Sequence, residues 1–309
     1  MTNETGGVLA VVVVNYGSSA LLERNLAPLS SALTGPLTVV VDNRTDDAER
    51  NSIAALAARH GWVGAYPESN LGFGAGVNLG ASVAFEAGAT HLLILNPDAT
   101  ITAEAVRSLL ERSLAAPGAL YCPRILRPDG STWFAGSDLH LDDGRLRNPA
   151  RRGDARVEPW LTGACLLVDR ALWQTVSGFD NDYFLYWEDV DLSHRVLAAG
   201  GRLVLCDDVT AVHDEGGTHT DADLAPRRHS DTYYRYVIRN RLLFAAKHLD
   251  DSAYRAWSRN ARAVAWETLL QGGRRQFLRS PQVLLVGWRA LREGHRLGAQ
   301  MRLRPDPQP

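Results

Sequence analysis

The sequence predicts an α/β fold built on a mostly parallel, Rossmann-like sheet, because apolar strands and helices alternate along its first half. The run 8–14 is continuously apolar, the runs 37–41 and 91–95 are mostly apolar, and all three are rich in Val, Ile or Leu. Such runs are typical of parallel strands that are buried on both faces. The segment 62–66 is expected to add a short strand.

Helices are expected between these strands. They cover residues 21–33, 48–60, 78–87 and 103–114, and Gly88 stands where the end of a helix favours glycine. Strands that are joined through helices pair in parallel, with the helices flanking the sheet. Ligands of such sheets bind beyond the carboxyl ends of the strands, so we expect the functional site there.

The second half of the chain has a different character. Residues 128–158 are rich in Gly, Pro, Asp and Arg, which predicts a hairpin or a mobile loop. The later elements are expected as an apolar segment at 160–168, a short helix from about Arg170, a polar helix at 188–199, a strand at 202–206 and helices from about Thr232. The sequence therefore divides into an α/β domain over residues 1–220 and a helical, basic extension over residues 221–309.

The composition argues against several classes of protein. The formal net charge of the 309 residues is -2, which gives no reason to expect nucleic-acid binding. Cys122, Cys165 and Cys206 are few and widely spaced, which favours a reducing compartment over a disulfide framework. The apolar run 8–14 is shorter than the ~20 residues that span a bilayer, and no basic segment precedes it. We therefore expect a cytoplasmic protein.

One segment departs from this even balance of charge. Residues 274–304 contain eight Arg and a single acid, Glu293, interspersed with Leu, Val, Phe277 and Trp288. A basic amphipathic helix of this kind can lie on an anionic membrane surface, here the inner face of the cell membrane. The alternatives are an ordinary surface helix with a solvated Arg-rich face and a contact between two copies in a homodimer.

Three of the predicted strands end in polar residues, which should converge at one edge of the sheet. They are Asn15-Tyr16, Asp42 and Asn96-Pro97-Asp98. A carboxylate at the position of Asp42 can accept the N3–H of a uracil or thymine ring, and the ring of Tyr16 can stack on that base. The alternative is that Asp42 only forms an Asx turn with the next residue. The convergence of the strand ends favours ligand binding.

Asp98 is a candidate ligand of Mg²⁺ or Mn²⁺. Both are hard cations that prefer oxygen ligands, and they neutralise the charge of a departing diphosphate. His213 follows a strand-like segment and is a candidate second ligand. The alternatives are a proline-containing turn at 96–98 that simply ends a strand, and a structural histidine.

The acidic run at Trp187-Glu188-Asp189 is the candidate for acid–base chemistry. Asp189 is the candidate group to deprotonate an acceptor hydroxyl. The alternative is structural, because acids at a helix N-terminus interact favourably with the helix dipole. Asp191 fits that alternative, since Arg195 lies four residues later on the same helical face.

The glycines Gly72, Gly74 and Gly76 are spaced like part of a dinucleotide-binding fingerprint, with Asp98 downstream. A dinucleotide fold places its glycines after the first strand, however, and Val77 replaces the last glycine of the fingerprint. We prefer the interpretation that these glycines let the backbone approach a diphosphate or a sugar closely.

Taken together, the motifs resemble those of the family 2 glycosyltransferases of the GT-A fold, and more narrowly their bacterial rhamnosyltransferase-like branch. The similarity runs from Val8 to about His213, with a weaker match at 233–243. Each motif is short, but their order and spacing are specific. The motifs are Val-Val-Asn-Tyr-Gly (13–17), Val-Asp-Asn (41–43), Asn-Leu-Gly-Phe-Gly-Ala-Gly-Val-Asn (70–78), Leu-Asn-Pro-Asp (95–98), Leu-Thr-Gly-Ala-Cys-Leu-Leu-Val (161–168), Gly-Phe-Asp (178–180) and Tyr-Trp-Glu-Asp-Val-Asp-Leu (186–192).

The resemblance implies a donor site. Asp42 would read the pyrimidine base and Tyr16 would stack on it. Asp98 occupies the metal-binding position of the family's DXD-like motif, and His213 matches a histidine that completes the metal site in some members. Asn96 stands where many members have Asp, so Asp98 is the only carboxylate of this motif. The residues expected to border the nucleotide sugar are Val14, Asn15, Tyr16, Asp42, Asn70, Gly74, Asn78, Asn96, Pro97 and Asp98.

The resemblance also implies the reaction. Asp189 matches the catalytic base, with Glu188 beside it, and an acceptor hydroxyl would attack the anomeric carbon with inversion. The acceptor is expected near Gly163, Trp187 and the 128–158 loop. The expected donor is a dTDP- or UDP-sugar that carries rhamnose or another deoxysugar. The expected acceptor is a glycan, a lipid-linked glycan or a small natural product.

Two other functions stay open on the sequence alone. A sugar-phosphate nucleotidyltransferase would also use an α/β sheet and a metal. It would need a basic, glycine-rich phosphate loop after the first strand, and residues 15–19 contain no Lys or Arg. A non-catalytic protein that binds nucleotide sugars would share the fold but would not depend on Asp189 for any turnover.

Overall fold

The computed structural model describes residues 8–33, 35–148, 156–214 and 229–303. The chain forms two compact units, each made of three segments, and each is described by itself. Unit 1 consists of Met1–Ser137, Pro159–Phe184 and Glu188–Thr220, and unit 2 of Asp138–Glu158, Leu185–Trp187 and Asp221–Pro309. The expected domain boundary near residue 220 falls between residues 215 and 228, outside the described residues.

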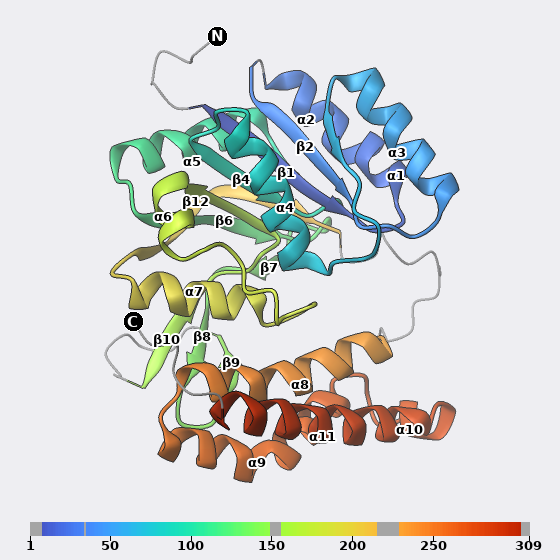
Figure 1. The fold of residues 1–309 in the computed structure, drawn as a ribbon, viewed down its shortest axis with the longest axis vertical. Coiled ribbons are helices and arrows are strands. Elements are labelled where there is room, and N and C mark those ends of the chain that lie inside the picture. The colour runs from blue at the N-terminus through green and yellow to red at the C-terminus, as the bar shows by residue number, and fades with distance from the viewer. Residues whose placement is uncertain (1–7, 34, 149–155, 215–228, 304–309) are drawn as a thin grey trace. The chain divides into compact units, whose positions relative to one another are not determined.

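Unit 1 is built on one large sheet. Its strands are β1 (Leu9–Asn15), β2 (Leu37–Asp42), β3 (Val63–Ala65), β4 (His91–Leu95), β5 (Ala99–Ile101), β6 (Ala119–Leu126), β7 (Thr132–Phe134), β11 (Cys165–Asp169) and β12 (Arg202–His213). The order is β3-β2-β1-β4-β11-β6-β12-β5, with β7 paired to β6 (Figure 1). The first four strands are parallel to one another, as are β6 and β12. The predicted mostly parallel sheet is confirmed.

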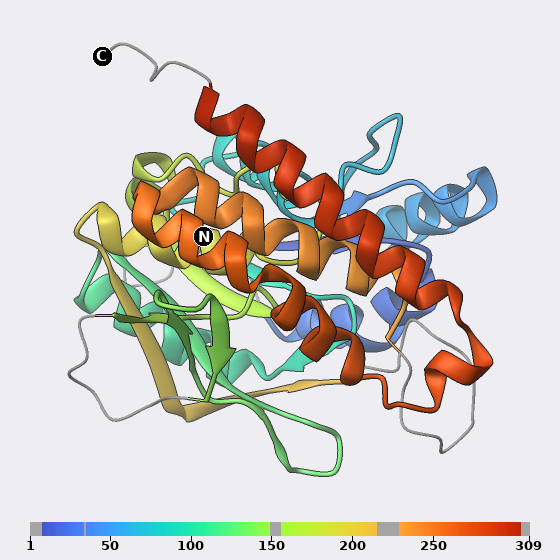
Figure 2. The same ribbon diagram turned by 90° about the horizontal axis from the view of Figure 1, so that it is seen from below.

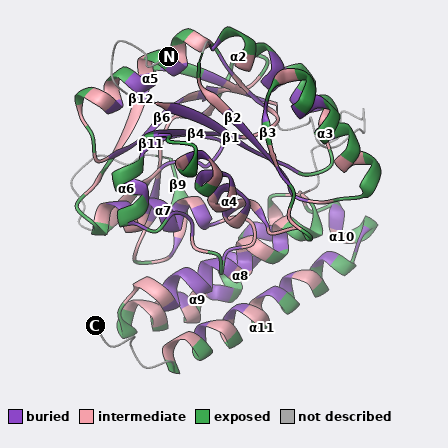
Figure 3. Ribbon diagram, turned by 45° about the horizontal axis from the view of Figure 1, so that its top comes forward, coloured by how far each residue is buried: buried purple, intermediate pink, exposed green. Residues whose placement is uncertain are grey.

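The centre of this sheet is buried on both faces, as the continuous apolar runs predicted. Every residue of β1, β4 and β11 is buried, and these strands are purple in Figure 3. β11 runs antiparallel between β4 and β6, a direction that hydrophobicity alone does not encode. β12 continues past the expected end to His213, because the ladder on β6 resumes after an irregularity between Cys206 and Thr210.

Helices flank the sheet of unit 1. They are α1 (Ser19–Leu21), a π-helical turn η1 (Leu22–Leu26), α2 (Ala27–Ala32), α3 (Asp47–His60), α4 (Phe73–Glu86), α5 (Ala103–Ala115), α6 (Arg170–Thr175) and α7 (Glu188–Ala198). α4 packs against β1 and β2, and α5 against β6, β11 and β12. Side chains of Asp46 and Thr102 accept backbone N–H bonds at the starts of α3 and α5, which satisfies part of each helix end.

The glycine-rich segment around the start of α4 lets this helix pack directly on the sheet. α4 begins at Phe73, several residues before the expected start. A Cβ atom on Gly76 would lie 2.9 Å from the side chain of Val14 in β1, so this separation requires glycine. Gly72 has a left-handed backbone (φ +83°), and a Cβ there would collide with the carbonyl oxygen of Phe184. These glycines therefore bring protein segments together.

Unit 2 combines a small sheet with packed helices. The strands are β8 (Ser137–His140), β9 (Arg145–Arg147) and β10 (Val157–Trp160), in the order β10-β8-β9. The helices are α8 (Asp231–His248), α9 (Asp251–Leu270), α10 (Gln276–Arg279) and α11 (Gln282–Leu303). α8, α9 and α11 lie against one another (Figure 2). The predicted helical C-terminal region is confirmed. No helix of the described ranges has the length and apolar character needed to cross a membrane.

An aromatic cluster forms the centre of unit 2. The rings of Phe244 and Trp257 stack with 5.8 Å between their centroids, and the ring of Trp187 lies 5.6 Å from Phe244 and 6.2 Å from Trp257. The guanidinium of Arg241 lies over Trp257 at 4.8 Å from the ring centre, a favourable cation–π position. Trp187 is thereby a core residue of this unit.

α11 packs through a stripe of small residues. Val283, Gly287, Ala290, Gly294 and Gly298 are its buried positions. They recur every three or four residues, so they share one face of the helix. The other positions are exposed or partly exposed, and α11 therefore alternates between purple and green in Figure 3.

Candidate functional site

The carboxyl ends of β1 and β2 bring two predicted site residues together. Asn15 and Asp42 are partners in the parallel register, and both are completely buried. Neither polar atom of the Asn15 side chain, nor Oδ1 of Asp42, has a hydrogen-bond partner among the described residues. Buried polar atoms without partners are rare and costly, so a ligand or a water molecule would be stabilised here. Tyr16, the next residue in the chain, is 57% exposed.

The second oxygen of Asp42 is held by Arg50, which the sequence did not reveal as a site residue. Arg50 Nε donates to Oδ2 of Asp42 at 2.7 Å, and its Nη2 donates to the carbonyl oxygen of Pro67 at 2.5 Å. The same guanidinium lies 5.7 Å from the centre of the exposed Tyr66 ring. Burial, followed by the charge of Asp42, raises the pKa of Tyr66. An Arg on a polar helix carries no motif, so only the fold reveals this contact.

Asp98 and His213 meet although they are 115 positions apart in the chain. Oδ1 of Asp98 lies 3.0 Å from Nε2 of His213, because β12 ends beside β5, just after the 96–98 turn. The ring of Trp133 packs on the imidazole with 4.4 Å between centroids. The carbonyl oxygen of Pro97 accepts a hydrogen bond from the Asn25 side chain at 2.8 Å. The predicted Asp98–His213 pairing in space is therefore present.

This pair fits part of a divalent metal site. Two ligands at about 2.1 Å and at right angles around an octahedral cation are about 3 Å apart, which matches the separation of Oδ1 and Nε2. Nδ1 of His213 is buried and has no partner in the described part of the chain. Among the described residues there is no group of three or more His, Cys, Asp or Glu side chains that could hold a metal. Further ligands would therefore come from water or from a bound diphosphate.

Asp189 is linked to the 96–98 turn through two backbone hydrogen bonds. The N–H of Asn96 donates to the carbonyl oxygen of Ala164 at 2.9 Å. The N–H of the preceding residue, Gly163, donates to Oδ2 of Asp189 at 3.1 Å. The loop before β11 thus brings the start of α7 to the same edge of the sheet as the turn that carries Asp98.

Glu188 and Asp189 are both harder to ionise than ordinary carboxyl groups. Glu188 is buried, and its Oε2 has no described partner. Burial, and then the charge of Asp189, raise the pKa of Glu188 well above its usual range. Asp189 is partly exposed, and desolvation raises its pKa to about 6 against the N–H groups of Gly163 and Val190, which lower it. With a pKa of about 6, Asp189 is therefore ionised at neutral pH, as a general base must be, while burial favours the protonated form of its neighbour Glu188.

The third acid of this run has a structural role. Asp191 is completely buried, and Arg195 Nε donates to its Oδ2 at 2.7 Å. The predicted pairing of Asp191 and Arg195 along one face of the helix is confirmed. Among the described residues no cation forms such a pair with Asp189, and its part in the chemistry stays a prediction.

Asn70, Gly74 and Asn78 hold the loops around α4. Asn70 Oδ1 accepts the N–H of Gly72 at 2.8 Å. Asn78 is paired to the backbone of Phe179, with its Nδ2 donating to the carbonyl oxygen at 2.7 Å and its Oδ1 accepting the N–H at 2.9 Å. A Cβ on Gly74 would lie 2.9 Å from Cβ of Phe179. Their contact with a donor stays a prediction.

The residues predicted for the acceptor side fall in different units of the chain, and the structure does not test them as a site. Gly163 belongs to unit 1 and Trp187 to unit 2. Residues 149–155 of the expected acceptor loop lie outside the described residues. The role of these positions toward an acceptor therefore stays a prediction.

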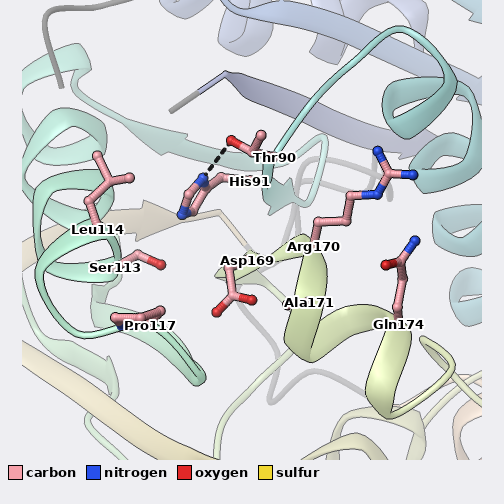
Figure 4. Close-up of a pocket in the computed structure, with 9 residues that line it drawn as sticks. All are labelled: Thr90, His91, Ser113, Leu114, Pro117, Asp169, Arg170, Ala171 and Gln174. Carbon is pink, nitrogen blue, oxygen red and sulfur yellow. Dashed lines mark hydrogen bonds between the residues drawn. The ribbon is translucent and has the colours of Figure 1, made fainter. Parts of the chain in front are cut away.

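A separate pocket of about 360 Å³ lies at the other end of β4. His91, the first residue of that strand, lines it together with Thr90, Ser113 and Asp169, and His91 Nδ1 lies 3.0 Å from Thr90 Oγ1 (Figure 4). None of the predicted site residues lines this pocket. It is distinct from the edge that carries Asp98, which follows the last residue of β4.

The fold and the chemistry of this edge define a class of protein. A mostly parallel α/β sheet that gathers a buried Asp, an Asp–His pair and a partly exposed Asp beyond its strand ends fits a glycosyltransferase of the GT-A fold. The chain belongs to the family described as "Glycosyltransferase like family 2", whose profile matches residues 6–234. The protein is therefore a glycosyltransferase, as the resemblance predicted, and not a nucleotidyltransferase.

Individual proteins agree with this family. The chain is 34% identical over 261 residues to an N-acetylglucosaminyl-diphospho-decaprenol L-rhamnosyltransferase of Mycobacterium tuberculosis, covering 73% of this chain and 83% of that one. It shares the fold of GalNAc-T7 with UDP, GalNAc and Mn²⁺ (TM-score 0.55, 15% identity, 83% of this chain and 55% of that one). It also shares the fold of the mannosyltransferase PcManGT of Pyrobaculum calidifontis with GDP-Man and Mn²⁺ (TM-score 0.53, 15% identity, 98% and 88%).

Proposed function

We propose that the protein transfers a sugar from a pyrimidine nucleoside diphosphate to an acceptor hydroxyl with inversion, and that Asp189 is the catalytic base. The observation that carries the proposal is the combination of exposure, contacts and pKa at Asp189. It is partly exposed, held by the N–H of Gly163, and linked through the loop before β11 to the turn that carries Asp98. Its pKa of about 6 leaves it ionised at neutral pH and still basic enough to accept a proton.

The proposed chemistry needs one proton acceptor and one charged leaving group. Asp189 accepts the proton of the acceptor hydroxyl as its oxygen bonds to the anomeric carbon. The bond from that carbon to the diphosphate breaks on the opposite face, which inverts the configuration. Asp98 and His213 would hold a Mg²⁺ or Mn²⁺ ion, which supplies positive charge to the leaving diphosphate when bound. Burial favours the neutral form of Glu188, which adds no repulsion to that diphosphate.

The donor is proposed to carry uracil or thymine. The unpartnered Oδ1 of Asp42 suits the N3–H of these bases, and the ion pair with Arg50 holds the Asp42 side chain in place. Because Asp42 has no exposed surface, entry of a base requires a local movement, for which the exposed rings of Tyr16 and Tyr66 are the candidates. The rhamnosyltransferase relative supports rhamnose as the sugar.

Asp42→Asn tests the proposed recognition of a pyrimidine base. We expect UDP- and dTDP-sugars to raise the melting temperature of the wild type more than GDP-sugars do, and the variant to bind the pyrimidine donors about 10- to 100-fold more weakly, since a hydrogen bond to a charged group is lost. Asp169→Asn is the matched control. Asp169 is also buried and accepts two backbone N–H bonds, but it lies at the other end of the sheet. A preference for GDP-sugars, or equal losses in both variants, would contradict the assignment.

The acceptor is proposed to be a lipid-linked glycan, and unit 2 offers a surface that suits a membrane. Half of the ten large apolar side chains that are exposed in the described residues fall between 266 and 288. The surface comprises Trp266, Leu278, Leu284, Leu285 and Trp288 together with the exposed Arg274, Arg275, Arg279, Arg289 and Arg292. We call it the basic apolar surface.

The charges of this surface are not neutralised within the described part of the chain. None of its five Arg forms an ion pair with a described residue, and Glu293, the one acid of the segment, pairs instead with Arg235 and Arg239. The guanidinium of Arg292 lies 4.7 Å from the centre of the Trp288 ring. Tryptophan and arginine side by side suit the boundary between lipid headgroups and acyl chains. We propose that the basic apolar surface binds an anionic bilayer.

Vesicle sedimentation tests this surface. We expect the protein to sediment with vesicles of equal phosphatidylglycerol and phosphatidylcholine at low salt, but not with phosphatidylcholine alone or in about 1 M salt, where charges are screened. The double variant Leu284→Glu, Trp288→Glu should bind about tenfold more weakly or worse, since it loses apolar burial and gains repulsion. Val63→Glu, a similarly exposed position on β3, should bind normally. A different outcome is that the wild type does not bind vesicles but forms a concentration-dependent dimer, which the double variant abolishes. The basic apolar surface would then be a homodimer contact and not a membrane-binding surface.

A further inference from the structure

The backbone just before the candidate base is held in an unusual conformation. Tyr186 and Trp187 have φ values of +64° and +74°. This left-handed region is unfavourable for side chains other than glycine and occasionally Asn or Asp. Two such residues in succession, neither of them glycine, persist only where surrounding contacts hold them. The next residue, Glu188, is the first of α7, and Asp189 follows it.

One buried side chain forms hydrogen bonds with the backbone of this turn. Asn240 is completely buried in α8 of unit 2. Its Nδ2 donates to the carbonyl oxygens of both Leu185 and Tyr186, at 2.9 and 2.7 Å. The two carbonyl oxygens converge on a single amide because the turn is left-handed. An extended backbone points successive carbonyl groups in opposite directions.

The amide of Asn240 is itself fixed. Its Oδ1 accepts a hydrogen bond from Arg239 Nη1 at 2.6 Å, which leaves Nδ2 facing the two carbonyl groups. Arg239 Nε lies 3.3 Å from Glu293, which also pairs with Arg235. The side chain that follows the turn, Trp187, is anchored in the aromatic cluster of unit 2.

We propose that Asn240 is a positioning residue that fixes the left-handed turn before α7 and thereby the direction in which Asp189 leaves that turn. This proposal rests on the role of Asp189 in the proposed function. Only Glu188 separates Asp189 from the last residue of the turn, so a change in the φ of Trp187 swings the carboxylate directly. Loss of the hydrogen bonds from Asn240 changes the position of Asp189 without removing any group that contacts the sugar.

Asn240→Leu is the test, since leucine has a similar volume and no hydrogen-bonding group. We expect kcat to fall about 10- to 100-fold, as for a catalytic group displaced by about 1 Å, while the thermal shift produced by the nucleotide sugar stays that of the wild type. The acid limb of the pH–rate profile should move below pH 6, because a released Asp189 is better hydrated and its pKa falls toward the ordinary value.

Asn260→Leu is the matched control. Asn260 also lies in unit 2, where its Nδ2 donates to the carbonyl oxygen of Asp143 at 3.1 Å and its Oδ1 accepts from Arg241 at 2.7 Å. Among the described contacts, Asn260 forms no hydrogen bond with residues 185–187. We expect it to lower the melting temperature and to leave kcat and the pH–rate profile unchanged.

Tyr186→Gly in the Asn240→Leu background provides the decisive measurement. Glycine adopts a positive φ without strain, so the turn should form without the hydrogen bonds of Asn240. We therefore expect kcat to recover about tenfold. A merely structural role for Asn240 predicts no such recovery. The proposal is overturned if Asn240→Leu keeps the wild-type kcat and pH–rate profile, or if both Asn variants lose activity equally. A normal kcat in Asp189→Asn would instead overturn the role of the base itself.

Discussion

Asp189→Asn is expected to lower kcat by about 10²- to 10⁴-fold, the usual contribution of a positioned general base. Asparagine keeps the shape of the side chain and can still accept the N–H of Gly163, so the fold and the binding of the donor should be retained. The loss should therefore appear in kcat and not in the melting-temperature shift caused by the nucleotide sugar. In the wild type, kcat/KM should rise with pH and level off above about pH 6, the pKa of Asp189.

Glu188→Gln is the matched control for this substitution. Burial favours the protonated form of Glu188, so an isosteric neutral amide should change kcat little. Near-normal turnover in Asp189→Asn, or a larger loss in Glu188→Gln, would transfer the role of base away from Asp189. Unchanged turnover in both would contradict an Asp-based mechanism at this helix.

Asp189→Asn should also stabilise the protein at alkaline pH. The pKa of Asp189 is higher in the folded state, about 6, than the ~3.9 of an unfolded Asp. Between these values the folded protein binds more protons than the unfolded one, so the free energy of unfolding falls as pH rises through that window. Asp189→Asn removes this loss. Its melting temperature should exceed that of the wild type at pH 8, and the gain should disappear near pH 4.

Asp98→Ala is expected to have the second largest effect, lowering kcat/KM by about 100-fold or more because a ligand of the proposed metal is removed. Titration with Mn²⁺ should strengthen donor binding to the wild type and have little effect on the variant. A chelator should reproduce the variant's defect in the wild-type protein. Calorimetry or a thermal shift with UDP and Mn²⁺ measures this directly, without turnover.

Two further variants sharpen the metal experiment. His213→Gln should weaken Mn²⁺ binding about 10- to 100-fold, since an imidazole ligand is replaced by a weaker one. Asp214→Asn is the control, because this neighbouring acid is more exposed and pairs with Arg24 at 3.7 Å. Donor affinity that ignores both the chelator and Asp98→Ala would remove the metal from the proposed mechanism.

The parts of the fold that depend on local pattern were predictable. The continuous apolar runs gave the parallel strands, and the polar residues that follow them gave the edge where Asn15 and Asp42 meet. β11 was not assigned a direction, because a buried strand has the same composition whether it runs parallel or antiparallel. β5 is three residues long and was not recognised, since it is too short to show a period.

The residues of the candidate site also differ in whether the sequence alone could reveal them. His213 could be named as a candidate ligand beside Asp98 from its residue type, and the resemblance to a family supported the pairing, but no local rule relates residues so far apart. Arg50 and Asn240 were not recognised at all. Each acts through a contact that exists only after helices pack, and each belongs to a common residue type in an ordinary helical context. Sequence motifs readily reveal the residues that contact a ligand. They reveal less readily the supporting residues that position them.

The interleaving of the two units limits how the chain can be divided. Trp187 is a core residue of unit 2, yet the following residue opens the helix that carries Asp189 in unit 1. A fragment ending at residue 214 would contain every predicted catalytic and metal-binding residue and still lack Phe244 and Trp257, the packing partners of Trp187. Recombination with relatives at such a junction would therefore produce chimeras in which the base is present but unanchored. The part of this enzyme that should be exchanged as one piece is the whole chain from β1 through α11, because α11 packs on α8 and its Glu293 pairs with Arg239.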